Sequence, residues 1–279
     1  MKTTLWKQVV LLFVFTCALQ SMQAKSPVRN NTPVLVSDSL AGINNVPVAV
    51  TIPLQSSVQS FVDSYLDEHA DLLDNIKQRN GKTFTLIQKI LVKRGVPAEL
   101  LYLAVVESKL KNAATSGVGA AGIWQLMPST ARTLGLKVDA ETDQRRHIYH
   151  SSIAAANYLN TLYKQFDDWL LVVAAYNCGA GNVQKAIKQS GSREFWKMQR
   201  YLPKETRDHV KRFIATHFHY EGEGSLATLT KTERTKYLAS LLETNEEDDT
   251  SDQPSSTVLP VRWVLMTHEE GKLIAVLRK

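Results

Sequence analysis

Apolar residues recur every three or four positions between residues 58 and 91, which is the spacing of one face of an α-helix. One series runs from Val58 to Leu66, and a second runs from Phe84 to Leu91. The Asn80-Gly81 pair between them is a dipeptide typical of turns. The pattern therefore predicts two amphipathic helices joined at this pair.

Two later segments are apolar at almost every position, as in helices that are buried on all sides. The first covers residues 100–106, follows a break at Pro97 and ends at Glu107. The second covers residues 169–173 and leads to Tyr176. Each buried helix is therefore expected to carry a polar side chain at its C-terminal end.

Capping residues predict where other helices begin. Asp167-Asp168 place negative charge at the N-terminal end of the second buried helix, where the helix dipole favours it. Ser151-Ser152 are predicted to cap a helix over residues 153–166. Thr230 and Glu233 have the spacing of a capping box, which predicts a further helix from Thr230 onward.

The carboxyl group of Glu107 is the first candidate for chemistry. Apolar neighbours and the negative end of the helix dipole both disfavour its charged form, so we expect it to hold a proton readily. A general acid that works near neutral pH needs this property. Taken alone, the segment fits a solvated glutamate at a helix end at least as well, so the assignment depends on the segments that follow.

Two glycine-containing segments follow Glu107. Residues 116–128 read SGVGAAGIWQLMP, and residues 174–181 read AAYNCGAG. Glycines permit tight turns and close approach of a ligand, while the amides and the tyrosine can hydrogen-bond to it. One carboxyl group with two such segments suggests a groove that cuts carbohydrate.

The N-terminal residues predict export. Lys2 and Lys7 flank a start that leads into an apolar run over residues 9–19, and a stretch of small and polar residues ends at Ala24. We expect a signal peptide cleaved after about Ala24. An uncleaved anchor is the alternative, but the run is shorter than the roughly 20 residues that span a bilayer. Cys17 lacks the small-residue context of a lipoprotein cysteine, so lipidation is not expected.

Composition is that of a globular protein, with 279 residues of which 44% are hydrophobic and 22% charged. The formal net charge of +6 favours a polyanionic partner, such as nucleic acid, an anionic membrane surface or the acidic bacterial cell wall. No nucleic-acid-binding motif and no zinc-ligand spacing is present, so neither nucleic acid nor a metal is expected. Cys178 is the only cysteine after the signal, which excludes an intramolecular disulfide.

The domain organisation follows from these patterns. We expect a signal peptide over residues 1–24, a linker over 25–56 and one helical domain over 57–220. A helix and an acidic linker occupy residues 221–257, and a C-terminal extension of unknown function occupies 258–279. The two β-rich runs of this extension predict a small hairpin.

Five ordered motifs carry a resemblance to a known family: E-S, S-x-x-GAAGIWQLMP, D-x-R, AAYNxGxG and LPxETR. Together they resemble the transglycosylase (SLT) domain of bacterial lytic transglycosylases, most like the MltD type, over residues 58–217. The resemblance implies a mainly α, lysozyme-like fold. It also implies that the β-1,4 bond between N-acetylmuramic acid and N-acetylglucosamine is cleaved in peptidoglycan glycan strands, without a cofactor.

The resemblance also assigns residues, motif by motif. Glu107 matches the catalytic acid and base of the family. The remaining matches are expected to bind the substrate: Ser116, Gln125, Met127, Tyr176, Asn177 and Glu205. Met127 fits plain core packing equally well.

A solitary carboxyl group is what the implied mechanism needs. Most glycosidases use two carboxylates. Here Glu107 would protonate the leaving oxygen and then act as base on the C6 hydroxyl, which gives a 1,6-anhydro sugar. A hydrolytic muramidase is the alternative, with Asp139, Glu141 or Asp143 as the second carboxylate, and a non-catalytic peptidoglycan-binding protein is another.

The chain departs from the family pattern at two positions. His209 stands where the family usually has a tyrosine after ETR, and His147 replaces the acid usually found after D-x-R. Asp143 and Arg145 of the D-x-R motif are predicted to form a structural ion pair. We expect both departures to leave the proposed acid untouched.

Overall fold

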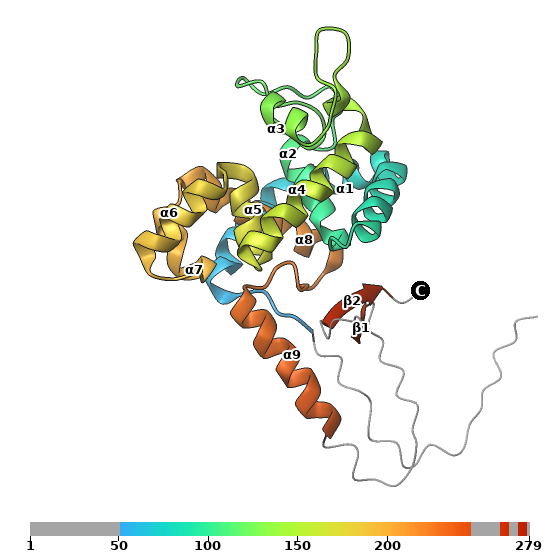
Figure 1. Ribbon diagram of the computed structural model, residues 1–279. Helices are drawn as coiled ribbons and strands as arrows, with labels where there is room; N and C mark the ends of the chain where they lie inside the picture. The colour runs from blue at the N-terminus through green and yellow to red at the C-terminus, as the bar shows by residue number, and fades with distance from the viewer. Residues whose placement is uncertain (1–50, 247–262, 268–272, 278–279) are drawn as a thin grey trace, which may run out of the picture. The chain divides into compact units, whose positions relative to one another are not determined.

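The computed structural model describes residues 51–246, 263–267 and 273–277. The described part is mainly helical, as predicted (Figure 1). Its longer helices are α1 (Ser56–Lys93), α2 (Leu101–Ser108), α4 (Ile148–Phe166), α5 (Trp169–Cys178), α6 (Ala180–Ser190), α8 (Lys204–Glu221) and α9 (Lys231–Glu246). The short ones are η1 (Ala98–Leu100), α3 (Pro128–Thr133), η2 (Gln144–Arg146), α7 (Phe195–Met198) and η3 (Gln199–Tyr201).

Helix α5 lies at the centre of the packing. Every residue from Trp169 to Ala175 is buried, and the helix packs against α4, α6 and α8. Helix α2 is also buried along most of its length and packs against α1 and α8. Both predictions of fully buried helices are confirmed, because an all-apolar helix leaves no face that water can cover at low cost.

Helix α1 agrees with the prediction of two helices joined at Asn80-Gly81. Residues 56–93 comprise two helical stretches that meet at a kink at Asn80, whose backbone angles (φ −118°, ψ 20°) are not helical. The side-chain amide of Asn80 donates to the carbonyl oxygen of Ile76 at 2.9 Å. This local hydrogen bond stabilises the bend between the two stretches.

Helix α4 begins earlier than predicted. Its N-cap is His147, whose ring accepts a hydrogen bond from the backbone N–H of His150. Ser151 and Ser152 therefore lie inside the helix, and both are buried. The prediction that they cap the helix was wrong, because their hydroxyl groups serve packing contacts: Ser152 accepts the indole N–H of Trp124 at 2.9 Å.

Two other predicted caps are confirmed. Asp168 caps α5 by accepting the N–H groups of Leu170 and Leu171 at 2.9 and 3.1 Å. Thr230 and Glu233 form a reciprocal capping box, with N···O distances of 2.8 and 3.3 Å. The backbone N–H of Lys231 also donates to Asp168, so one carboxylate joins the starts of α5 and α9.

The two ends of the chain fall largely outside the described residues. The predicted signal peptide, residues 25–50 of the predicted linker and most of the acidic linker lie there. Ile52, at the end of the predicted linker, is buried and accepts a hydrogen bond from the N–H of Gly224 at 2.8 Å. Strands β1 (Trp263–Thr267) and β2 (Leu273–Leu277) pair antiparallel, with Leu265 opposite Ala275, in the two runs where a hairpin was expected. None of the helices in the described part is both long and apolar enough to cross a membrane.

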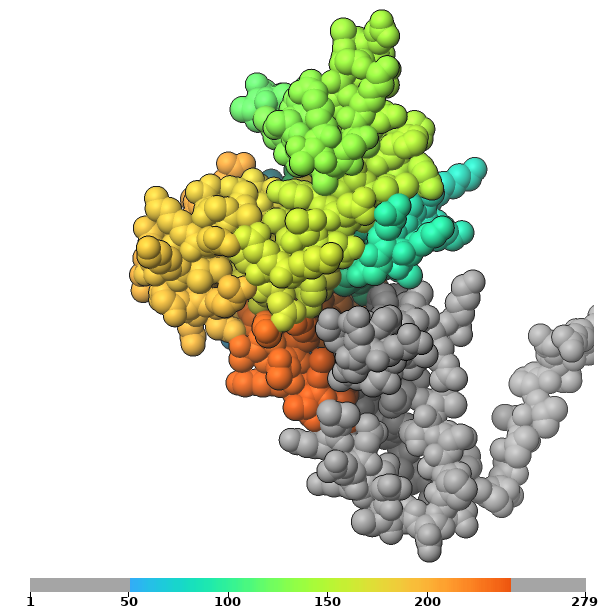
Figure 2. Space-filling view, in the orientation of Figure 1, coloured from blue at the N-terminus to red at the C-terminus, as the bar shows by residue number. Residues whose placement is uncertain are grey.

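Two lobes flank the middle of the fold in the space-filling view. Figure 2 shows the green segment around α3 and the gold segment around α6 and α7 as projections, with the surface receding between them. In Figure 1 the same segments stand on either side of α4 and α5. Helices α2 and α5 each lead, at their C-terminal ends, into one of these segments.

His217, one of two buried histidines of α8, predicts a loss of stability in acid. Burial lowers the pKa of His217 to about 4, and its Nε2 lies 2.9 Å from the Ser225 hydroxyl. An unfolded histidine titrates near 6.5, so the unfolded chain takes up a proton that the folded chain refuses. Stability from this residue is therefore lost as the pH falls from about 6.5 to about 4, by about 3 kcal/mol.

Urea unfolding of the wild type and His217→Gln across this pH range measures the effect. We expect the wild type to lose about 3 kcal/mol more than the variant on acidification. Parallel pH dependences of the two proteins would contradict the assignment to His217.

Candidate active site

Glu107 lies in the last turn of α2, and its side chain is 15% exposed. The helix ends directly after it, because Lys109 and Leu110 both adopt left-handed backbone angles (φ 56° and 57°). The next residue, Ser108, is buried and its hydroxyl donates to the carbonyl oxygen of Ile123 at 2.9 Å. The end of α2 is thus tied to the glycine-containing segment of residues 116–127.

His209 of α8 contacts the proposed acid directly. Its Nε2 lies 3.0 Å from Oε1 of Glu107, and the histidine side chain is 4% exposed. Glu107 keeps its place as the proposed acid, and the change from tyrosine to histidine puts a ring nitrogen in contact with it. The sequence argument treated α2 and α8 separately, whereas the two helices pack against each other and join residues 102 positions apart.

The segment after Glu107 is a compact double turn. Short bridges pair Ala121 with Thr115 on one side and with Leu126 on the other. Gly122 has φ +78°, and the backbone of Arg145 approaches it so closely that a Cβ atom would lie 1.9 Å from the Arg145 carbonyl oxygen. Only glycine fits this position, because it combines a left-handed backbone with contact to another backbone.

Arg145 holds this turn in place and confirms the predicted ion pair. Its guanidinium forms two hydrogen bonds of 2.8 Å to the carboxylate of Asp143, and it is 8% exposed. It also donates to the carbonyl oxygens of Gly119 and Leu126 at 2.7 and 3.1 Å. A hydrogen-bonded pair of this kind positions backbone rather than reacting with a substrate.

Two of the three candidate second carboxylates, Asp139 and Asp143, already accept hydrogen bonds within their own loop. Hydrogen bonds from Arg145 hold the pKa of Asp143 below its usual range. The backbone N–H of Thr142 lowers the pKa of Asp139, which also accepts the N–H of Glu141. Glu141 itself is exposed. Each of the two aspartates therefore stabilises its own loop.

Tyr176 and Asn177 close the other side of the site from the end of α5. The phenol of Tyr176 donates to the carbonyl oxygen of Trp124 at 2.7 Å. Burial, followed by the charge of Glu107, raises the pKa of Tyr176 well above its usual value, so the phenol stays neutral. Asn177 accepts the hydroxyl of Thr206 at 2.7 Å, which links α5 to α8.

The backbone of Ile123 and Trp124 is the point where these elements meet. The carbonyl oxygen of Ile123 accepts a hydrogen bond from Ser108 of α2, and that of Trp124 accepts one from Tyr176 of α5. The indole of Trp124 donates to Ser152 of α4. Three helices thus fix the segment that carries Gln125. No local pattern in the sequence indicates this junction, because its partners come from three separate helices.

The remaining predicted binding residues differ in how firmly they are held. Gln125 has a left-handed backbone (φ 45°), and its amide nitrogen donates to Gly122 at 2.8 Å. The hydroxyl of Ser116 accepts the N–H of Ala120 at 3.0 Å. Met127 is 40% exposed, which rules out the alternative that it is plain core. Glu205 is exposed in the first turn of α8.

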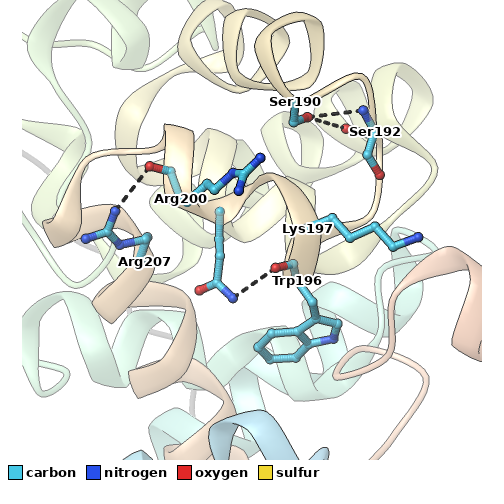
Figure 3. A pocket seen from close by; sticks show the side chains of 7 residues that line it. Ser190, Ser192, Trp196, Lys197, Arg200 and Arg207 are labelled. Carbon is cyan, nitrogen blue, oxygen red and sulfur yellow. Dashed lines mark hydrogen bonds between the residues drawn. The ribbon is translucent and has the colours of Figure 1, made fainter.

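A cavity of about 780 Å³ lies in a different set of residues. Figure 3 shows it between the end of α6, α7, η3 and the start of α8. Three cations contribute to its lining, namely Lys197, Arg200 and Arg207, and Arg207 donates to the backbone of Arg200 and Leu202. None of the predicted site residues lines it. The arrangement around Glu107, which combines a partly buried carboxyl group with polar partners, is the better candidate for chemistry.

Metal binding finds no support in the described part of the chain. No three His, Cys, Asp or Glu side chains of the described residues come together in a way that could hold a metal ion. Cys178 is a free thiol at the end of α5, and burial raises its pKa.

Comparison with known proteins matches the part of the chain that contains this site. The family model of the transglycosylase SLT domain matches residues 85–199, which include Glu107 and the AAYNCGAG segment. The membrane-bound lytic murein transglycosylase D of Escherichia coli (strain K12) is 48% identical over 128 residues, which are 44% of this chain and 28% of that protein. A protein named for tributyltin chloride resistance from Alteromonas sp. (strain M-1) is 38% identical over 96 residues, or 34% of this chain and 46% of its own length.

Among solved structures, the complex of the 70-kDa soluble lytic transglycosylase with bulgecin A has a TM-score of 0.50 and 23% identity. The match covers 63% of this chain and 29% of that one, and it bears on the fold alone. The chain spans less than half the length of the curated relatives that it matches. The chain thus contains a segment that matches the transglycosylase SLT domain, and over 128 residues it is similar to membrane-bound lytic murein transglycosylase D.

Proposed function

We propose that this chain is a peptidoglycan lytic transglycosylase, a lyase that acts on a polysaccharide. Its substrate is the glycan strand, and it cleaves the β-1,4 bond between N-acetylmuramic acid and N-acetylglucosamine to leave 1,6-anhydro ends. The observation that carries the proposal is the setting of Glu107, a largely buried carboxyl group that contacts His209 and interacts with Tyr176. Two of the candidate second carboxylates, Asp143 and Asp139, are engaged in their own loops.

The chemistry needs one carboxyl group in two roles. Glu107 gives its proton to the glycosidic oxygen as the bond to C1 breaks, and the N-acetyl group of the substrate stabilises the positive charge that develops at C1. The resulting carboxylate then takes the proton of the C6 hydroxyl, whose oxygen forms the new bond to C1. The proton from the C6 hydroxyl replaces the one that the carboxyl group gave to the leaving sugar, so the acid is restored and no water is consumed.

The other site residues would bind and orient the sugar. Ser116, Gln125, Met127 and Asn177 lie on the segments that adjoin Glu107 in sequence or in packing, and Glu205 is one turn before His209 on α8. Tyr176 would act through the backbone, because its phenol holds the carbonyl of Trp124 beside Gln125. The exposure of Met127 supports contact with a ligand rather than with the core.

The proposal extends to location and organisation. The predicted signal over residues 1–24 supports export to the periplasm or cell envelope without lipidation, and the 48% identical relative is named as membrane-bound. The helical domain would span residues 57–220, between the predicted linker and the C-terminal extension. The net charge of +6 suits the acidic cell wall rather than nucleic acid, for which no motif is present.

Mass spectrometry of digested peptidoglycan tests the reaction. We expect purified protein to release muropeptides with anhydro ends, each lighter by one water than its hydrolytic counterpart. Reducing ends would instead support a hydrolytic muramidase. Binding to the insoluble wall without any release would support a non-catalytic peptidoglycan-binding protein.

A further inference from the structure

The contact between His209 and Glu107 is unlike an ordinary surface ion pair. Both side chains are largely withdrawn from water, and Nε2 lies 3.0 Å from Oε1. The other ring nitrogen of His209, Nδ1, is buried and has no hydrogen-bond partner among the described residues. One ring nitrogen therefore contacts the acid, and the other has no polar contact among the described residues.

The contact with the carboxyl group determines where the ring carries its hydrogen. A carboxylate oxygen can only accept, so Nε2 must carry a hydrogen when Glu107 is ionised. Nδ1 has no partner with or without a hydrogen, so it does not oppose this arrangement. The geometry thus favours a ring hydrogen on Nε2.

We propose that His209 is a positioning residue that keeps the catalytic proton on one oxygen of Glu107; this inference rests on the proposed function of Glu107. The ring donates from Nε2 to Oε1 in both protonation states of the carboxyl group. Oε1 is thereby occupied, and Oε2 alone carries the proton to the glycosidic oxygen and receives it back from the C6 hydroxyl. The same hydrogen bond serves both steps, and the ring neither gains nor loses a proton.

The buried Nδ1 offers no acceptor for a second ring hydrogen. An imidazolium would carry an N–H at Nδ1, and no acceptor for it lies among the described residues. The proposed role therefore needs only the one N–H of the ring that faces Glu107.

Few other ionisable groups act on this pair. Tyr176 of α5 interacts with Glu107, and its raised pKa keeps it neutral. On α8, Asp208 interacts with Lys204, Lys211 and Arg212, and Arg212 also interacts with Tyr65 of α1. The contact of His209 with the carboxyl group is therefore the one that the variants below change.

Two substitutions separate a hydrogen-bond donor from a filler of space. His209→Phe removes the donor but keeps an aromatic ring, and we expect kcat to fall roughly ten- to hundredfold with KM little changed. His209→Gln places an amide N–H near the position of Nε2, and it should recover most of the loss, to within about threefold of the wild type. His217→Gln is the matched control, because it replaces a buried histidine of the same helix whose partner is Ser225.

The split between kcat and KM, together with rescue by His209→Gln, gives a readout that packing alone would not move. Wild-type kcat in His209→Phe would overturn the proposal.

A spectroscopic measurement covers the case in which a variant does not fold. The ¹⁵N chemical shifts of the wild-type ring report which nitrogen carries the hydrogen. We expect a protonated Nε2 and a bare Nδ1 at neutral pH; a hydrogen on Nδ1 would refute the inference without any variant. Fragments with anhydro ends separate the two proposals, since failure of the proposed function leaves no protein that forms such ends, whereas failure of this inference leaves His209→Phe as active as the wild type.

Discussion

Glu107→Gln should lower the turnover of peptidoglycan by roughly 10³- to 10⁴-fold while the protein stays folded. The loss lies at the upper end for one acid-base group because the same carboxyl group acts in both steps. The amide has nearly the size of the acid, and its oxygen can still accept the hydrogen bond from Nε2 of His209. Release of soluble fragments from purified cell wall measures the rate, and circular dichroism checks the fold.

Glu141→Gln is the matched control for this substitution. It makes the same chemical change at an exposed loop position, and we expect the rate of the wild type. The hydrolytic alternative makes a different prediction, because a second carboxylate in that loop would lower turnover when lost. A rate for Glu107→Gln within about tenfold of the wild type would remove this residue from the role of acid.

Local chemistry explains which features could be predicted from the sequence. The all-apolar runs of α2 and α5 admit only a buried position, and the Thr230 and Glu233 capping box depends on four consecutive residues. Asp143 and Arg145 are two residues apart, so their ion pair is also local. The sequence also predicted that Glu107 and Tyr176 lie at the ends of two buried helices. Both helices hydrogen-bond to the backbone of residues 123–124.

The features that the sequence did not predict depend on contacts between distant helices. His209 reaches Glu107 only because α8 packs against α2, and nothing near either residue indicates this pairing. Ser152 resembles a helix cap in the sequence, but Trp124 makes its hydroxyl an acceptor within α4. In both cases a tertiary contact decided between two local states of similar energy.

The departure of the ETR motif from its family is the signal that pointed to His209. A histidine in place of tyrosine keeps a donor at that position but replaces a phenol with a ring that has two nitrogens. Its importance became visible only with the distance to Oε1 and the burial of Nδ1. A change in a motif is thus best weighed by asking which group it touches in the fold.

Gly122→Ala should be the most damaging of the glycine substitutions, with a loss of about 3–5 kcal/mol in the free energy of unfolding. The new Cβ would lie 1.9 Å from the Arg145 carbonyl oxygen and 2.7 Å from its carbon. Backbone on both sides has little freedom to move, because Arg145 is fixed by Asp143 and by the carbonyls of Gly119 and Leu126. The left-handed φ of +78° adds strain for any L-residue.

Two glycines of the same segment separate steric overlap from backbone strain. Gly119 has φ +89° but no atom within 4 Å of an added Cβ, so Gly119→Ala should cost only about 1–2 kcal/mol. Gly117 has neither constraint, and Gly117→Ala should stay within about 0.5 kcal/mol of the wild type. Urea unfolding of the three variants measures the series, and equal losses at Gly122 and Gly119 would contradict the close approach of Arg145.

The same series connects the fold to the reaction. Gly122 begins the turn whose next residues, Ile123 and Trp124, are held by Ser108 beside Glu107 and by Tyr176. Displacing this turn moves Gln125 relative to the carboxyl group, so Gly122→Ala should lose activity even below its melting temperature. Gly117→Ala, at the exposed start of the segment, should leave the fold around Glu107 intact. Wild-type activity in folded Gly122→Ala would mean that the placement of Gln125 does not matter to turnover.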